Sequence, residues 1–182
     1  ERNLEYGGRC VEVVPHIPEE VIRRIRIAAA KAKADIFLIE IGGTVGDYQN
    51  ILFIEAARVL KLKHPGDVLF ILVTFLPVPS KLGEMKTKPT QNAVRQLNSY
   101  GVQPDVIIAR SSHPLDAKRK EKLAIWCNVP AEAVVSSLDS IHFKASSRPC
   151  ELADATHGTV NSATMPQVAP LIHFSRSFLV IF

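Results

Sequence analysis

Four short runs of apolar residues, without the alternation of a half-exposed strand, constrain the fold of this chain most strongly. They cover residues 35–40, 68–74, 105–109 and 133–136. Continuous apolar strands of this kind are typical of a parallel sheet that is covered on both faces. Segments with helical signals separate the runs, so the sequence predicts an α/β fold.

Helical signals lie between these runs. Pro18 and the two carboxylates after it suit a helix start, because proline fits the first turn and negative charge is stabilised at a helix N-terminus. Asn50 can cap a second helix that ends before Pro65. Two more helices are expected over residues 89–100 and 116–127. The repeat of strand, loop and helix predicts a doubly wound domain with a mostly parallel sheet.

Length and composition narrow the class of protein. The 182 residues allow one domain, and 47% hydrophobic with 22% charged residues indicates a globular chain with a sizeable core. The net charge of +4 suits a small phosphate-bearing ligand and is not concentrated enough to predict a nucleic-acid surface. The start of the sequence shows no charged segment followed by an apolar one, and no apolar run reaches about 18 residues, so we expect a cytoplasmic protein with no membrane partner.

The three cysteines predict a reducing compartment. Cys10, Cys127 and Cys150 lie far apart and lack the short paired spacing of zinc sites and disulfide frameworks. Nothing near Cys127 predicts a reactive thiolate, so we expect it to be a small buried side chain.

Residues 143–182 differ in character from the rest of the chain. They hold 5 charged residues, against 35 in the preceding 142. Neither a helical nor a strand period occurs in them before Phe178. We therefore predict one α/β unit over residues 1–142 and an unassigned tail over residues 143–182, irregular or non-native in structure.

Glu40 is the first candidate for chemistry, because it closes an apolar strand and is followed at once by Gly42 and Gly43. Ligands of open parallel sheets collect beyond the carboxyl ends of the strands. A strand-end acid there can hold a hydrated magnesium ion that bridges nucleotide phosphates. It can equally cap a neighbouring helix or face water, and the glycines suit an ordinary tight turn.

The segment KTKPTQ at residues 86–91 is the sharpest local feature. Lys86 and Lys88 stand just before a predicted helix, where ammonium groups and unpaired backbone N–H donors together suit a polyphosphate. The alternative is a solvated loop in which Thr87 caps the helix. A second basic run around Lys122 lies on a predicted helix, and composition alone favours a solvated face there.

Several motifs, in their order along the chain, resemble CTP synthase. They are VPHI at residues 14–17, EIGGTVGD at 40–47, GEMKTKPTQ at 83–91, QPD at 103–105 and CNVP at 127–130. The resemblance covers residues from about 10 to 142. It implies the C-terminal part of the N-terminal synthetase (amidoligase) domain, with a P-loop NTPase-like fold of the dethiobiotin-synthetase-like type, incomplete at its N-terminus.

The resemblance also implies an activity: ATP and Mg²⁺ activate the uracil O4 of UTP by phosphorylation, and ammonia from glutamine displaces the phosphate to give CTP. Glu40 then corresponds to a magnesium ligand, and Arg110 to a position near the ATP base. The segments implied to bind UTP or CTP comprise Asp47, Tyr48, Gln49, Lys86, Thr87, Lys88, Pro89, Thr90, Gln91 and Lys122. In that family the pyrimidine site lies between subunits of a homotetramer.

The chain departs from the family pattern in several places. The Gly-rich phosphate loop and a second magnesium carboxylate would precede Glu1, and the glutaminase domain would follow the synthetase domain. Gln49 replaces a glutamate usual in the family, which puts discrimination of CTP in doubt, and residues 137–142 form a shortened stretch. We therefore expect a fragment that is inactive alone, with a frame-shifted or assembly-derived tail.

Two other interpretations stay open. A dethiobiotin-synthetase-like ligase shares the expected fold, although the KTKPTQ segment argues against it. A non-catalytic pyrimidine-nucleotide-binding or assembly module is the alternative from a different class, and the missing phosphate loop favours it for the isolated chain.

Overall fold

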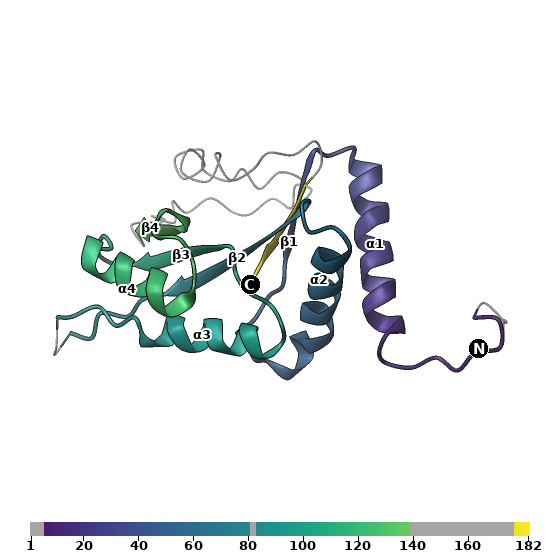
Figure 1. The fold of residues 1–182 in the computed structure, drawn as a ribbon, viewed down its shortest axis with the longest axis horizontal. Helices are drawn as coiled ribbons and strands as arrows, with labels where there is room; N and C mark the ends of the chain where they lie inside the picture. Colours follow the sequence, from purple (N-terminus) through teal and green to yellow (C-terminus); the bar gives the residue numbers. More distant parts are fainter. Residues whose placement is uncertain (1–5, 81–82, 139–176) are drawn as a thin grey trace, which may run out of the picture.

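Five parallel strands form a single sheet in the computed structural model, which describes residues 6–80, 83–138 and 177–182 (Figure 1). The order across the sheet is β1-β5-β2-β3-β4. The strands are β1 (Ile36–Glu40), β2 (Val68–Phe75), β3 (Val106–Ser111), β4 (Val134–Leu138) and β5 (Ser177–Ile181). The predicted α/β fold with a parallel sheet is confirmed, and the four apolar runs all form strands.

Helix α1 precedes β1, and α2, α3 and α4 connect the strands from β1 to β4 in chain order. They are α1 (His16–Ala32), α2 (Ile51–Lys63), α3 (Lys88–Ser99) and α4 (Ala117–Cys127), with short 3₁₀ turns η1 (Tyr48–Asn50) and η2 (Ala131–Ala133). None of the helices in the described part of the chain is long and apolar enough to cross a membrane.

The helix boundaries follow from local chemistry. Asp116 caps α4, since its side chain accepts a hydrogen bond from the backbone N–H of Arg119 at 2.7 Å. Asn128 ends the same helix in the left-handed region, at φ 53°. Asn50 does occupy the N-cap position of α2, but the prediction that its side chain caps the helix is wrong, because the Asn50 amide donates to the Gly42 carbonyl at 2.5 Å instead.

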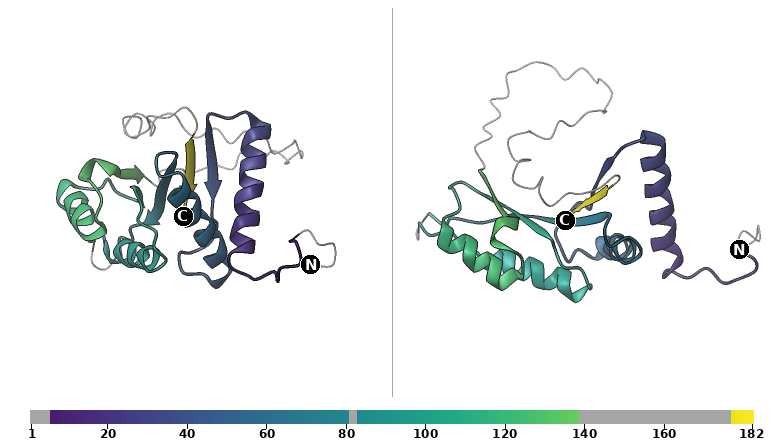
Figure 2. Two further views of the ribbon diagram at one scale, coloured as in Figure 1. Left: turned by 45° about the vertical axis from the view of Figure 1, so that its right-hand side comes forward. Right: turned by 45° about the horizontal axis from the view of Figure 1, so that its top comes forward.

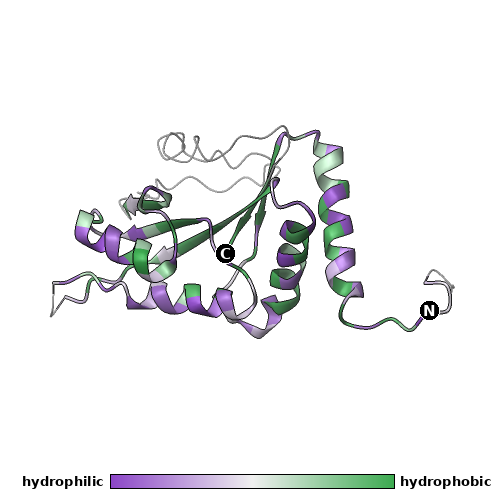
Figure 3. Ribbon diagram, in the orientation of Figure 1, coloured by the Kyte–Doolittle hydropathy of each residue, from purple (hydrophilic) through white to green (hydrophobic). Residues whose placement is uncertain are grey.

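The main core lies between the helices and one face of the sheet. It joins Ile22 of α1, Leu60 of α2, Leu97 of α3 and Leu123 of α4 to strand residues such as Leu72. Figure 2 shows α2, α3 and α4 on the same side of the sheet, and Figure 3 shows apolar residues along the strands and on the helix surfaces that face them. Within the described residues, helices therefore cover one face of the sheet only.

The opposite face carries a smaller apolar cluster. Its buried members come from β2, β3, η2, β4 and β5: Ile71, Val106, Ala133, Val135 and Leu179. At the β1 edge, by contrast, Ile36 and Leu38 are each 45% exposed. The second face thus carries apolar residues from several strands, and those at β1 are the more exposed.

Strand β5 lies between β1 and β2 and pairs in parallel with both. The backbone N–H of Ile41 donates to Ile181 at 2.9 Å, and that of Val73 donates to Phe182 at 2.9 Å. Leu179 and Val180 are 4% and 1% exposed. Residues 177–182 are therefore a central part of this sheet, although the sequence analysis assigned them no element. The predicted boundary near residue 142, and the tail as far as residue 176, lie outside the described residues.

The position of β5 makes its side chains important for stability. We expect Leu179→Ala to lower the free energy of unfolding by about 2 to 5 kcal/mol, because a buried leucine is lost from between two strands. Leu62→Ala is the matched control, since Leu62 is 71% exposed on α2; we expect a change within about 0.5 kcal/mol. Urea unfolding measures both. Equal stability of the two variants would show that β5 is not part of the core.

Candidate functional site

The first group of predicted residues comprises Glu40, at the carboxyl end of β1, and Asp47, Tyr48 and Gln49 in the segment that follows. Glu40 is the last residue of β1 and is exposed to solvent. It is paired in register with Ile181 of β5, so its height in the sheet is fixed from the neighbouring strand. The loop that follows leads over η1 into α2.

This loop is held by its own polar groups. The Asp47 carboxylate accepts the backbone N–H of Thr44 at 2.9 Å. Gly43 has φ 95°, and a Cβ there would lie 2.8 Å from the Asn50 amide nitrogen and 2.9 Å from the Asp47 carboxylate. A side chain at position 43 is therefore excluded both by the backbone conformation and by its neighbours. Asn50 is 8% exposed and completes the turn.

A cavity of about 210 Å³ lies beside Glu40, between α1, β1, α2 and β5. Its lining is apolar apart from Glu40 and Asn50, and includes Ile39, Phe53 and Val180. The candidate lysines do not line it. Its chemistry suits apolar packing more than the binding of a triphosphate.

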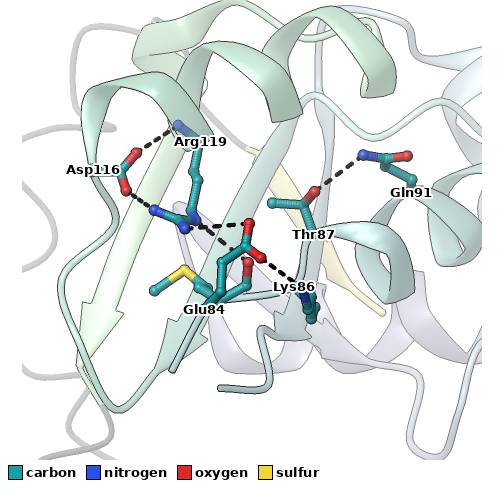
Figure 4. Close-up of polar contacts among 7 residues, drawn as sticks. Glu84, Lys86, Thr87, Gln91, Asp116 and Arg119 are labelled. Atoms are coloured by element: carbon teal, nitrogen blue, oxygen red, sulfur yellow. Dashed lines mark hydrogen bonds and ion pairs between the residues drawn. The ribbon is translucent and has the colours of Figure 1, made fainter. Parts of the chain in front are cut away.

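The second group of predicted residues surrounds the start of α3 (Figure 4). The Lys86 ammonium lies 2.8 Å from the Glu84 carboxylate, whose other oxygen lies 3.7 Å from the Arg119 guanidinium. Arg119 in turn pairs with Asp116 and donates to the Met85 carbonyl at 3.4 Å. The loop before α3 and the first turn of α4 are thus joined by charged side chains.

These cations change the ionisation of Glu84. The pKa of the Glu84 carboxyl is lowered, first by the hydrogen bond from Lys86 and then by the charges of Lys86, Arg119 and Lys122. Lys122 therefore lies within electrostatic range of this cluster, although it makes no ion pair with Glu84 among the described residues. The basic run on α4, which composition alone favoured as a solvated face, contributes to the same charged region as Lys86.

Several of the predicted ligands in α3 are buried. Thr87, Thr90 and Gln91 are 6%, 0% and 4% exposed. Gln91 donates to the Thr87 hydroxyl at 3.2 Å, and Thr90 contacts the hydroxyl of Thr74 on β2 at 3.0 Å. Lys88 and Pro89 are exposed. In this structure the threonines and Gln91 fix the start of the helix, and the lysines are the side chains that reach solvent.

The two groups lie toward opposite ends of α3 within one chain. A Cβ at Gly46, in the loop before Asp47, would lie 3.4 Å from the Gln96 side chain in the last turns of α3. Lys88 begins the same helix eight residues earlier, which is about 12 Å along the axis. Tyr48 is 91% exposed. In a single copy, the loop before Asp47 therefore lies beside the C-terminal part of α3, and the lysines lie at the start of the helix.

Arg110 lies on β3 near its carboxyl end, exposed, in register with Phe75 and Ser137.

The described residues contain no cluster of three or more His, Cys, Asp or Glu side chains that could hold a metal ion. Glu40 could thus contribute one carboxylate to Mg²⁺, which commonly takes its remaining ligands from water and phosphates.

The sequence analysis did not identify Glu84 or Arg119 as members of this region. The signal available was the alternation Glu84-Met-Lys86, which places an acid beside a candidate phosphate ligand. Arg119 belongs to the basic run on α4, but no signal linked it to this loop, because Arg119 lies 34 residues after Met85 and only the fold brings the two together.

The candidate residues form two groups on a parallel α/β sheet: an acidic strand end at Glu40 with the loop after it, and a cationic loop-to-helix junction at the start of α3. This defines the protein as an α/β domain with a parallel sheet, a class in which ligands collect beyond the carboxyl ends of the strands. The chain matches the family model described as CTP synthase N-terminus over residues 1–153. The chain belongs to the CTP synthase N-terminal family.

Individual relatives give the same assignment. The chain is 45% identical to a CTP synthase of Chlamydia trachomatis serovar L2 over 139 residues, and 49% identical to that of Pyrococcus horikoshii over 140 residues. The CTP synthase of Methanothrix thermoacetophila is 46% identical over 140 residues. These matches cover 76%, 76% and 77% of this chain, and 26% of each relative. The chain thus spans about a quarter of the length of these relatives.

Cys127 is not a candidate nucleophile, as the sequence analysis predicted. It is buried at the end of α4, and burial raises the pKa of its thiol to about 11. At pH 8 the thiolate is then a fraction on the order of 10⁻³.

We expect a thiol reagent at pH 8 to modify the exposed Cys10 readily and Cys127 only slowly, because the thiolate is the reacting form. In urea both should react. Peptide mapping by mass spectrometry distinguishes them, and comparable labelling of Cys127 and Cys10 in the folded protein would contradict the burial of Cys127.

Proposed function

We propose that this chain carries the pyrimidine-nucleotide-binding part of a CTP synthase synthetase domain, with UTP and CTP as ligands. The full reaction of which it forms a part is the ATP- and Mg²⁺-dependent amination of UTP to CTP, with ammonia or glutamine as the nitrogen source. Family membership and the charged junction at α3 support the proposal together.

The observation that carries the proposal is the arrangement at the start of α3. Lys86 lies just before the helix and Lys88 is its first residue, and the first turn contains no acidic residue. The first N–H groups of a helix have no partner within the helix and favour negative charge. The buried contacts of Thr87, Thr90 and Gln91 hold this turn in place before a ligand arrives. Lys122 and Arg119 add positive charge from α4.

The separation of the two groups along α3 favours a site shared between copies. Asp47, Tyr48 and Gln49 lie near the C-terminal part of the helix, and the lysines lie at its start. A pyrimidine nucleotide that contacts both groups would then take them from different subunits, as in a homotetramer. The exposure of Tyr48, 91%, leaves it available for such a contact.

Glu40 is proposed as a magnesium ligand and Arg110 as a residue near the ATP base. The position of Glu40 at a strand end supports its role, because a rigid strand can hold one carboxylate in place for a hydrated ion. Mg²⁺ neutralises charge on the phosphates when it is bound. ATP itself would contact the same edge of the sheet.

We propose binding without turnover for these 182 residues alone. Phosphoryl transfer depends almost entirely on positioning and charge stabilisation of the β- and γ-phosphates. The printed sequence contains no Gly-rich loop that ends in Gly-Lys. This supports the second candidate function, a pyrimidine-nucleotide-binding or assembly module.

Lys86→Ala and Lys88→Ala should each weaken binding of UTP and CTP, because each removes a charge-assisted contact of about 1.5 to 3 kcal/mol. Lys63→Ala is the control, since Lys63 is exposed at the end of α2, away from the α3 junction. Isothermal titration calorimetry measures all three. Unchanged affinity of both site variants would refute the assignment.

The purified chain should form no CTP from UTP, ATP, Mg²⁺ and ammonia, while it still binds UTP. Chromatographic detection of CTP after a long incubation tests this, with a full-length CTP synthase as positive control. CTP formed above the background of a sample without ATP would contradict the proposal of binding without turnover.

A further inference from the structure

The Glu84 carboxylate lies among the cations that the proposed function assigns to phosphate. One of its oxygens is 2.8 Å from the Lys86 ammonium and the other is 3.7 Å from the Arg119 guanidinium. All three side chains lie at the surface: the exposed fractions are 59% for Glu84, 38% for Lys86 and 29% for Arg119 (Figure 4). A ligand can therefore reach this ion pair from solvent.

The same ammonium cannot serve Glu84 and a phosphate equally well. A phosphate oxygen that contacts Lys86 must displace the carboxylate or lie beside it, and two anions at that distance repel each other. The proposed site thus contains an anionic side chain, Glu84, that already contacts the ammonium assigned to phosphate.

Arg119 provides a second place for the displaced carboxylate. Its guanidinium is held by Asp116 and by the Met85 carbonyl, so it stays near Glu84 when Lys86 is taken by a ligand. The present distance of 3.7 Å between Glu84 and Arg119 is long for a hydrogen bond but within ion-pair range. A small rotation of the Glu84 side chain would exchange one partner for the other.

We propose that Glu84 is an internal competitor for the polyphosphate of the nucleotide, and that Arg119 accepts its carboxylate when the phosphate binds Lys86. This inference rests on the proposed function and adds a residue that sets the affinity of the same site. The competition lowers the affinity for any polyphosphate, independently of the base.

A positioning role for Glu84 predicts the opposite change in affinity. If Glu84 instead orients Lys86 toward the ligand, its loss would leave the lysine less well placed, and binding would weaken. The sign of the change in affinity therefore separates competition from positioning.

The test compares Glu84→Gln with Glu132→Gln, which removes the same charge from an exposed side chain on η2 that makes no ion pair among the described residues. The probes are UTP and inorganic triphosphate, titrated calorimetrically at low ionic strength. We expect Glu84→Gln to bind both probes roughly two- to five-fold more tightly, as suits an exposed ion pair. Glu132→Gln should bind as the unchanged chain does. Added salt should reduce the gain.

A double variant checks that the gain acts through Lys86. In the Lys86→Ala background, Glu84→Gln should give a smaller gain, since the ammonium for which the two anions compete is gone. Circular dichroism of each variant confirms that it is folded.

The outcomes test the competition by Glu84 separately from the proposed nucleotide binding. Equal or weaker binding of both probes by Glu84→Gln, while Lys86→Ala still weakens binding, overturns the competition and leaves the proposed function standing. A gain of the same size in the Lys86→Ala background also overturns it. Failure of the unchanged chain and of every variant to bind either probe overturns both proposals.

Discussion

The pairing of β5 with β1 and β2 is the interaction on which the rest of the structure depends. Among the described strands, β1 pairs with β5 alone, so the backbone hydrogen bonds of β5 connect Glu40 and its loop to the remainder of the sheet. Val180 and Phe182 are buried in the main core at the same place. Because a parallel strand must satisfy its backbone groups on both sides when buried, the segment in this position fixes where β1 and Glu40 lie.

Helix α3 separates the candidate ligand-binding residues into two groups, one toward each end of the helix. The helix is held to β2 by the contact of Thr90 with Thr74, and the lysines lie at its N-terminal end. The loop that carries Asp47 lies toward the other end, beside Gln96. A rigid helix of this length keeps the two groups toward opposite ends of α3 within one chain.

Electrostatics adds a further level to the same region. Positive charge from the loop before α3 and from α4 meets at Glu84, and the pKa of its carboxyl is lowered, first by the hydrogen bond from Lys86 and then by the surrounding positive charges. The region therefore contains an anionic side chain as well as cationic ones. In the competition that we propose, the affinity for anions depends on a balance between Glu84 and an external phosphate, and salt weakens both interactions.

The sequence by itself determined the α/β class, the strands over the four apolar runs, the approximate helix bounds and the family. These follow from periodicity, turn residues and ordered motifs, which are local in the chain. Tertiary structure alone decided the place of residues 177–182, the burial of Thr87, Thr90 and Gln91, and the meeting of Glu84 with Arg119. The physical reason is that each of these depends on packing between segments distant in the sequence, and local patterns of hydrophobicity do not specify which segments pair.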